Sequence, residues 1–292
     1  MSSPCAPGGA PGGRRFDPVT VRHRLVALAL AGCLAGGKAV AVEPIAHDLR
    51  IDIPVAAAAG LGWIGSELAK PALAPATCRW CDADSSGRDA LNGFDAAGRS
   101  LRWSNPRLAD TLSSLDAFVL LPVALLGLDA LAARRDHALD GWPVDALILV
   151  ETVAAQAALN QLVKFAVGRE RPFVHVLPDG EKRLTPAPSD NNLSFYSGHS
   201  SLAFSLAVGA GTIAHLRRYR SEPVIWAVGL PLAAGAAYLR MAADKHYATD
   251  VIVGSIAGAA LGFAVPWLHG RASSGQSGPP AASFVLSMPL PL

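Results

Sequence analysis

Long apolar segments separated by polar connections dominate this sequence from about residue 52 onward. They cover about residues 52–69, 115–133, 144–163, 201–216, 224–239 and 251–268. Each is close to the roughly 17–25 residues with which a helix crosses a bilayer. The pattern therefore predicts an all-α bundle of about six helices.

Polar side chains within the third apolar segment leave two environments open for this bundle. The segment holds Glu151, Gln156, Asn160 and Gln161, whereas the last two segments are almost free of charge. Polar residues in a membrane-spanning helix usually face the interior of the bundle. A soluble all-helical bundle produces the same pattern and is the alternative.

The composition favours the membrane. Of 292 residues, 51% are hydrophobic and 16% are charged, and the mean hydropathy is +0.32. This is more apolar than an average soluble domain. The net charge of +2 is too small to indicate a polyanionic partner, and no basic stripe with interleaved aromatics is present. A nucleic-acid partner is therefore not expected.

The charges of the connections predict how a membrane-embedded bundle is oriented. The arginines that follow the second and fourth segments are Arg134, Arg135, Arg217, Arg218 and Arg220. By the positive-inside rule these connections lie in the cytoplasm, and the intervening connections face away from it. A cleaved leader would require an odd number of spans, and the Ala/Gly-rich segment 52–69 would then lie along the membrane surface.

Residues 1–42 have the layout of a targeting segment. The arginines that precede its apolar run at 25–32 are Arg14, Arg15, Arg22 and Arg24, and small residues follow the run. This is the order of parts in a secretory signal. Acylation of Cys33 in a lipoprotein-type LAGC sequence, cleavage after Ala41 and an uncleaved anchor helix all remain open. Each of them implies export.

The rest of the chain divides into three regions. Residues 43–114 are expected to form an N-terminal helix and an extracytoplasmic loop, 115–269 a helical core and 270–292 a flexible tail. Cys78 and Cys81 in the loop are the only close cysteine pair. A zinc site would need two further ligands nearby, so we expect a local disulfide, with two unpaired thiols as the alternative.

Three short motifs in the second half of the chain carry candidate chemistry. The first contains Lys164, Arg171 and Pro172. A separation of seven residues places both cations on one face of a helix, and the proline predicts that this helix ends nearby. Two such cations suit an anion, although cations that snorkel at a membrane boundary give the same pattern.

The second motif, Ser197-Gly198-His199, stands between a polar loop and an apolar segment. Ser197 or Ser200 can cap the helix that follows, and the first backbone N–H groups of that helix would then point at an anion. Glycine lets the backbone approach a phosphate closely. Taken alone, these residues also suit a plain helix cap.

The third motif combines Arg240, His246 and Asp250. Four residues are one helical turn, so Asp250 can accept a hydrogen bond from one imidazole nitrogen and leave the other free as a nucleophile. A surface pair has the same spacing, but Arg240 beside an apolar run needs a function or a partner. The adjoining Asp244 and Lys245 are expected to be solvated loop charges, with contact to a substrate head group as the alternative.

In combination, the motifs resemble those of the type 2 phosphatidic acid phosphatase superfamily. The family pattern is Lys, six residues and Arg-Pro, then Pro-Ser-Gly-His, then Ser-Arg, five residues, His, three residues and Asp. This sequence departs from it at Tyr196, in place of proline, and at Leu239, in place of serine. The matching residues are Lys164, Arg171, Pro172, Ser197, Gly198, His199, Arg240, His246 and Asp250.

The resemblance implies the helical bundle of that family and a role for each motif residue. The phosphate-binding residues would be Lys164, Arg171, Ser197, Gly198 and Arg240. His246 would attack phosphorus and Asp250 would orient it, while His199 would protonate the leaving group and later activate water. No metal or cofactor is expected, because fixed cations can neutralise the phosphoryl charge as Mg²⁺ does elsewhere.

The activity implied is hydrolysis of a phosphate monoester or pyrophosphate of a lipid through a phosphohistidine. The site would lie in a bacterial cell membrane and face the periplasm or exterior, with the lipid phosphate and the membrane as partners. The alternatives are a soluble exported acid phosphatase, a chain anchored at Cys33, a vanadate-dependent haloperoxidase and an inactive membrane scaffold. The sequence selects neither the lipid nor the oligomeric state.

Overall fold

The computed structural model describes residues 42–275, except residues 85 and 87. The leader predicted for residues 1–42, with Cys33 and the alternative cleavage sites, lies outside the described residues apart from its last position. Helix α12 continues to Gly275, into the region that we expected to be a flexible tail, and residues 276–292 again lie outside the described part.

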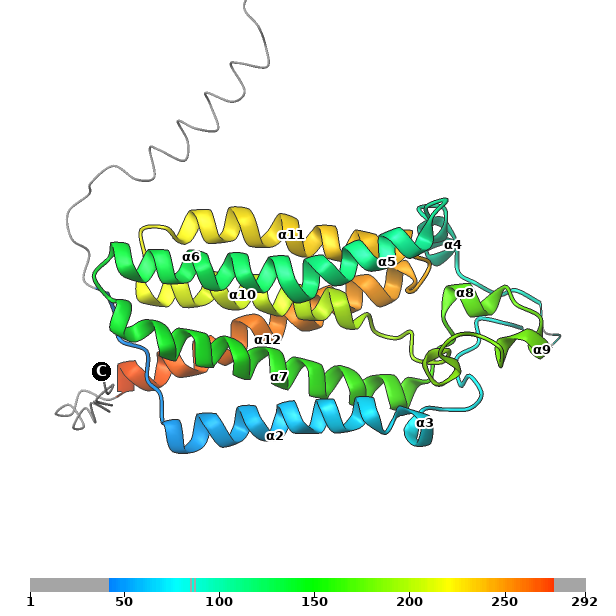
Figure 1. Cartoon of the computed structure of the whole chain (residues 1–292), viewed down its shortest axis with the longest axis horizontal. Helices are drawn as coiled ribbons and strands as arrows, with labels where there is room; N and C mark the ends of the chain where they lie inside the picture. The colour runs from blue at the N-terminus through cyan, green and yellow to red at the C-terminus, as the bar shows by residue number, and fades with distance from the viewer. Residues whose placement is uncertain (1–41, 85, 87, 276–292) are drawn as a thin grey trace, which may run out of the picture. The chain divides into compact units, whose positions relative to one another are not determined.

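Each predicted apolar segment forms a long helix, which confirms the all-α bundle (Figure 1). The long helices are α2 (Leu49–Leu68), α5 (Pro106–Leu115) continued by η1 (Asp116–Leu120) and α6 (Leu121–Arg135), α7 (Trp142–Val167), α10 (Gly198–Arg217), α11 (Glu222–Ala242) and α12 (Ala248–Gly275). The short ones are α3 (Lys70–Leu73), α4 (Gly93–Arg99), η2 (Leu139–Gly141), α8 (Pro172–His175), α9 (Asp179–Lys182) and η3 (Pro188–Asp190).

The second long helix begins earlier than its apolar segment. Asn105 caps α5, because its side chain accepts a hydrogen bond from the Leu108 amide, and Pro106 occupies the first turn. Polar residues in α5, such as Asp110, hide this start from a hydropathy pattern. The earlier start matters for function, since it brings Asp110 and Ser114 to the polar end of the bundle.

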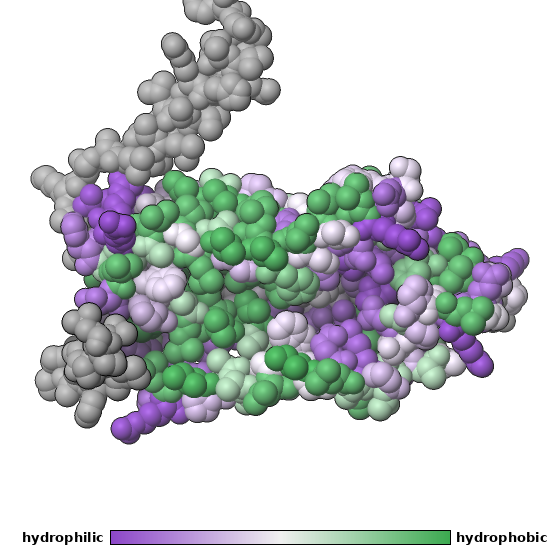
Figure 2. All heavy atoms as spheres, in the orientation of Figure 1, coloured by the Kyte–Doolittle hydropathy of each residue, from purple (hydrophilic) through white to green (hydrophobic). Residues whose placement is uncertain are grey.

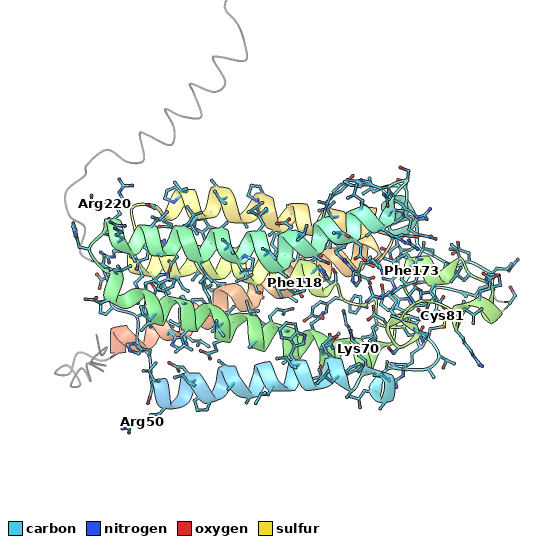
Figure 3. The ribbon with its side chains drawn as sticks, viewed as in Figure 1. Arg50, Lys70, Cys81, Phe118, Phe173 and Arg220 are labelled. Atoms are coloured by element: carbon cyan, nitrogen blue, oxygen red, sulfur yellow. A yellow bond between two sulfur atoms is a disulfide. The ribbon has the colours of Figure 1, made fainter. Side chains whose placement is uncertain are left out.

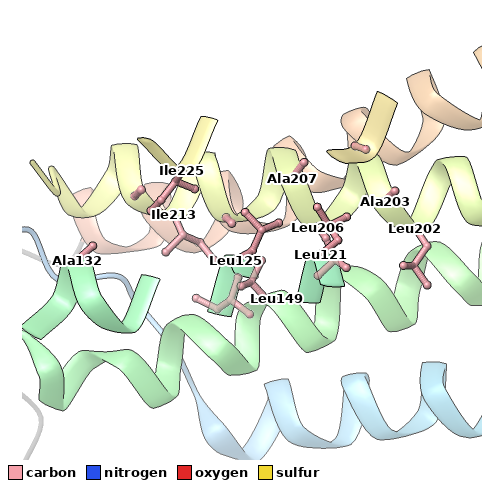
Figure 4. Packing of buried hydrophobic residues seen from close by; sticks show 14 of the residues in the cluster. Leu121, Leu125, Ala132, Leu149, Leu202, Ala203, Leu206, Ala207, Ile213 and Ile225 are labelled. Carbon is pink, nitrogen blue, oxygen red and sulfur yellow. The ribbon is translucent and has the colours of Figure 1, made fainter. Parts of the chain in front are cut away.

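Helix α10 lies at the centre of the bundle and packs against α6, α7, α11 and α12. Glycines of α12 permit the closest approach: a Cβ on Gly258 would lie 2.1 Å from the Ser201 carbonyl oxygen, and one on Gly262 would lie 2.7 Å from that of Ser205. Leucine, isoleucine and alanine side chains fill the remaining core (Figure 4). This packing holds α10, which begins with the second motif, against α12, which carries Asp250 of the third motif.

Apolar side chains cover much of the outer surface of the long helices (Figure 2). Val123, Leu162 and Ile256 are each more than 60% exposed, on three different helices. Four segments are long and apolar enough to cross a membrane: Pro106–Arg135, Leu139–Val167, Glu222–Ala242 and Ala248–Arg271. Helices α2 and α10 are not among them, and most of α10 is buried by its neighbours.

The two ends of the bundle carry different connections. The arginine-rich connections after α6 and α10 lie at one end, and the three motifs lie at the other (Figures 1 and 3). The Glu43 amide donates to the Arg217 carbonyl, so the chain enters α2 from the arginine-rich end. Helix α2 then runs beside α7 along the bundle axis, a direction that does not favour the hypothesis that segment 52–69 lies flat on a membrane.

Cys78 and Cys81 form the expected disulfide. The bond lies in the connection between α3 and α4, at the end of the bundle that carries the motifs (Figure 3). The short loop that it closes docks on the end of α7, because the Arg79 amide donates to the Gly168 carbonyl at 2.9 Å.

Candidate active site

A cavity of about 500 Å³ opens at the polar end of the bundle, between α5, α7, α10 and α11. Hydrophilic side chains gather around a hollow in this part of the surface (Figure 2). Six of the eight predicted site residues line the cavity: Lys164, Arg171, Gly198, His199, Arg240 and His246. The other two, Ser197 and Asp250, are fully buried and do not line it.

Lys164 and Arg171 reach the cavity from different elements, so our prediction that they share one helix was wrong. Helix α7 ends at Val167, because Gly168 takes a left-handed conformation with φ of 61°. Lys164 lies in the last turn of α7, whereas Arg171 lies in an extended segment directly before α8. The chain reversal at Gly168 still brings both side chains to one cavity.

The cavity is positively charged, although carboxylates partly compensate its cations. Arg171 pairs with Asp190 at 2.6 Å, and Arg240 pairs with Asp110 at 2.5 Å. No carboxylate lies within ion-pair distance of the Lys164 ammonium in the part of the chain that the structure describes. Five cationic side chains and three carboxylates line the cavity, which favours an anion over a divalent cation as ligand.

The second motif forms the start of α10, as predicted. The Ser197 hydroxyl accepts hydrogen bonds from the Ser200 amide at 3.4 Å and from the Ser200 hydroxyl at 2.8 Å. Ser197 is therefore the helix cap, and Gly198 is the residue that meets the cavity. A Cβ on Gly198 would lie 2.9 Å from Asn160 Oδ1, which would have to shift, and 3.4 Å from Lys164 Nζ, which is an ordinary contact.

Replacing Gly198 with alanine is expected to lower kcat/KM of the phosphatase activity proposed below by about 10–100-fold, because the new Cβ displaces the Asn160 amide beside the cavity and so disturbs the position of a bound phosphate. Steady-state kinetics measure the change. Gly127→Ala is the control, since a Cβ on Gly127 meets nothing within 4 Å. Equal kcat/KM for the two variants would contradict the close fit at Gly198.

His246 lies in the turn between α11 and α12, directly before Tyr247, and not on a helix as the spacing suggested. Its Nε2 atom faces the cavity, 3.4 Å from Arg171 Nη1. Its Nδ1 atom lies 3.7 Å from Asp250 Oδ2, beyond hydrogen-bond distance, and has no hydrogen-bond partner among the described residues. The Asp250 carboxylate is therefore close to this nitrogen without a hydrogen bond to it.

His199 approaches the cavity from the first turn of α10. Its Nε2 atom lies 3.2 Å from the Ser114 hydroxyl, and its ring packs edge-on against Phe118 with ring centroids 4.9 Å apart. Both contacts come from the continuous helix of α5, η1 and α6, which therefore restrains the ring. Two histidines from separate elements thus face one space.

Burial holds the pKa of both histidines well below the usual value. For His246, the neighbouring Arg171 and Arg240 lower the pKa further, and for His199 Arg240 and Lys164 do the same. Both imidazoles are therefore neutral at pH 7. A neutral His246 has a free electron pair for attack, and a bound phosphate dianion would raise the pKa of His199 again.

Several residues of this end escaped the sequence interpretation. Asp110 and Asp190 line the cavity. Lys245 also lines it, 3.6 Å from Asp110, in agreement with the alternative that it contacts a head group. Asp244 is not a solvated charge, as we had expected, because it is 4% exposed and pairs with Arg99 at 3.3 Å. A signal existed for Asp110, since a carboxylate at the start of a membrane-length apolar helix needs an explanation.

One group of potential metal ligands occurs in the part of the chain that the structure describes. Single atoms of Asp52, Glu151 and His269 lie within 4.8 Å of one another. The His269 ring already interacts with Glu151 at 3.2 Å and with the Ala46 carbonyl at 2.9 Å. None of these three residues lines the cavity.

Comparison with known proteins agrees with this geometry. Residues 145–274 match the PAP2 superfamily model, and this range holds every predicted site residue. No curated protein matches the chain. Among solved structures, the chain is similar to a transmembrane PAP2-type phosphatidylglycerolphosphate phosphatase from Bacillus subtilis. The two sequences are 17% identical, the alignment covers 74% of this chain and 98% of that chain, and the TM-score is 0.44. The family match runs from α7 into α12, the part of the chain that carries every predicted site residue, and covers less than half of the chain.

Proposed function

We propose that this protein is a metal-independent phosphatase that hydrolyses a phosphate monoester or pyrophosphate of a lipid. The observation that carries the proposal is the convergence of Lys164, Arg171, Arg240 and two neutral histidines on one cavity. Phosphoryl transfer needs mainly positioning and charge neutralisation, and three fixed cations supply both. The Gly198 amide at the start of α10 adds a hydrogen-bond donor for a phosphoryl oxygen.

In the first step, the Nε2 electron pair of His246 attacks phosphorus and the bond from phosphorus to the alkoxide oxygen breaks. His199, protonated in the substrate complex, gives its proton to that oxygen. Asp250 accepts from Nδ1–H and stabilises the positive charge of the phosphorylated imidazole. The products of this step are the lipid alcohol and a phosphohistidine at position 246.

In the second step, the now neutral His199 takes a proton from water as the water oxygen attacks phosphorus. The bond between phosphorus and Nε2 breaks, and the electron pair returns to His246. Inorganic phosphate leaves, and His199 carries the proton needed for the next cycle. No step requires a metal ion, so EDTA is expected to leave the rate unchanged.

An apolar cavity supports a lipid as the substrate. It has a volume of about 330 Å³, lies between α2, α6, α7 and α10, and shares Trp63, Phe118 and Leu202 with the lining of the polar cavity. Almost all of its lining is apolar, including Gly60 and Leu206. An acyl or prenyl chain in this space would extend directly from a phosphate held by the cation cluster.

The charge pattern supports a site that faces away from the cytoplasm. The arginine-rich connections lie at the end of the bundle opposite the cavity. With those connections in the cytoplasm, the cavity would open on the periplasmic or exterior side. A soluble substrate could also reach it there, which makes the contribution of the apolar cavity the point to test.

Gly60→Phe is expected to raise KM for a long-chain lipid phosphate by about tenfold or more, because its ring fills the space for the chain. A Cβ on Gly60 meets nothing within 4 Å, so the helix has room for a side chain at this position. Phosphate release is measured in EDTA for phosphatidic acid, phosphatidylglycerol phosphate, an isoprenoid pyrophosphate and a soluble aryl phosphate. KM for the aryl phosphate should stay within about twofold of wild type.

Gly62→Phe is the matched control, since Gly62 is equally open but does not line the apolar cavity. The two variants should differ in KM for the lipid phosphates and have the same KM for the aryl phosphate. Equal kinetics of the two variants with every lipid would remove the support for a chain site. Activity on the aryl phosphate alone would favour the soluble type of acid phosphatase.

A further inference from the structure

A fully buried arginine behind the cavity binds three carboxylates at once. The Arg169 guanidinium donates from Nη1 to Asp250 Oδ1 at 2.7 Å, from Nη2 to Asp95 Oδ2 at 2.7 Å and from Nε to Asp82 Oδ2 at 2.9 Å. Nη1 also donates to the Thr249 hydroxyl at 2.7 Å. Arg169 is 0% exposed and does not line the cavity, so it cannot bind substrate itself.

Two aromatic rings fix the plane of this guanidinium. The Arg169 Cζ atom lies 4.0 Å from the ring centroid of Trp80 and 4.0 Å from that of Tyr247. Tyr247 directly follows His246 in the chain, so the stack also restrains the turn that carries the candidate nucleophile. Stacking and a planar fork of donors are properties of arginine that lysine lacks.

Asp250 depends on this arginine for its orientation. Its Oδ1 atom binds Arg169, while its Oδ2 atom accepts from the Ser194 hydroxyl at 2.5 Å and from the Tyr247 amide at 3.0 Å. The same Oδ2 atom lies 3.7 Å from Nδ1 of His246. A rotation of the carboxylate would therefore change its distance from the imidazole.

Half of the partners of Arg169 come from outside the segment that matches the family. Trp80 lies in the loop that the Cys78–Cys81 disulfide closes, and Asp82 directly follows this loop. The Trp80 carbonyl accepts from the Glu170 amide at 3.0 Å. Asp95 lies in α4, is 0% exposed and also accepts from the Thr249 amide at 2.8 Å. The region between α3 and α5 thus completes the surroundings of Asp250.

We propose that Arg169 is a positioning residue that holds Asp250 against Nδ1 of His246, and that the disulfide loop and α4 hold Arg169. The inference rests on the proposed function, because it assigns Asp250 the role of orienting the nucleophile. Loss of one carboxylate partner leaves buried charge uncompensated, so the network acts as a unit. Residues 78–95 are then a working part of the site.

Arg169→Lys is expected to reduce kcat by about 10–100-fold with KM within twofold of wild type, as for other residues that orient a functional group. Lysine keeps the charge but cannot bind three carboxylates and stack between two rings. KM is preserved because the cavity cations are untouched. Asp82→Asn keeps the shape of the side chain at this left-handed position (φ 51°) and removes one of the three carboxylates. This variant should reduce kcat by a smaller factor.

A purely structural role would lower the number of folded sites, not the rate of each site. The rate is therefore divided by the number of sites that bind orthovanadate, a phosphate analogue. The double variant Asp82→Asn/Arg169→Lys should be no slower per site than Arg169→Lys alone, because Asp82 acts through Arg169. Reduction of the disulfide, or Cys78→Ser/Cys81→Ser, should slow wild type and leave Arg169→Lys unchanged per site.

Arg88→Ala is the control in the same region, since Arg88 forms an exposed ion pair with Asp84 at 3.0 Å and should give wild-type kinetics. A wild-type rate per vanadate-binding site in Arg169→Lys, in an active preparation of the parent protein, would overturn the positioning role. Absence of phosphate release by the parent protein on every substrate would instead refute the proposed function.

Discussion

Replacing His246 with alanine is expected to reduce kcat by about 10⁴–10⁶-fold, the range found when a residue of a covalent catalytic unit is removed. His246 supplies the electron pair that attacks phosphorus, and its Nε2 atom is the imidazole nitrogen beside Arg171 at the cavity. The cations remain in the variant, so orthovanadate should still bind. Phosphate release under saturating substrate measures the loss, and added imidazole should restore part of the rate by entering the vacated space.

His215→Ala is the matched control for this variant. His215 is 72% exposed, lies in the last turn of α10 and pairs with Glu222 at 3.0 Å, far from the cavity along the same bundle. Its kinetics should equal those of the parent protein. Turnover within tenfold of wild type in His246→Ala would remove His246 from the role of nucleophile and would favour direct attack by water.

Replacing His199 with alanine is expected to reduce kcat by about 10²–10⁴-fold for a lipid phosphate, the usual contribution of a general acid. An alkoxide is a poor leaving group and needs the proton of His199. An aryl oxide leaves without one, so the first step with an aryl phosphate should change little while the second step slows. Rapid-quench kinetics separate these steps. An equal loss in both steps would contradict the assignment.

The same variant should also change the dependence of kcat on pH. Burial and the cavity cations hold the pKa of both histidines well below the usual value in the empty site. In the substrate complex, activity requires neutral His246 and protonated His199, so the rate falls on the acid side as His246 gains a proton and on the alkaline side as His199 loses one. His199→Ala should abolish the alkaline limb of the first step with lipid substrate. If the alkaline limb persisted in this variant, a group other than His199 would be the general acid.

The fold was predictable because each helix carries its own signal. Apolar segments of membrane length predicted the helices, Ser197 predicted the start of α10, and loop charges distinguished the two ends of the bundle. The start of α5 was missed, because polar residues follow its cap. The three motifs lie in or beside connections at the end opposite the arginine-rich connections, so they were expected to lie near one another. Six of their eight site residues reach the cavity for that reason.

The remaining parts of the site depend on contacts between distant segments, which a local pattern does not contain. The left-handed turn at Gly168 separates Lys164 from Arg171, although the two fit one helical face by spacing. Arg169 stands inside the first motif, yet its partners Asp82 and Asp95 belong to a polar connection with no apolar periodicity. Only the folded chain shows that this connection reaches the surroundings of Asp250.

The most direct test of the account is to locate the phosphoryl group during turnover. His199→Ala should accumulate the intermediate with a ³²P-labelled aryl phosphate, because its first step is spared and its second is slow. After an alkaline quench and proteolysis, we expect an acid-labile label on the peptide that contains His246, with a burst of aryl alcohol equal to the number of sites. Label on any other residue, or steady release of the alcohol without a burst, would contradict the mechanism.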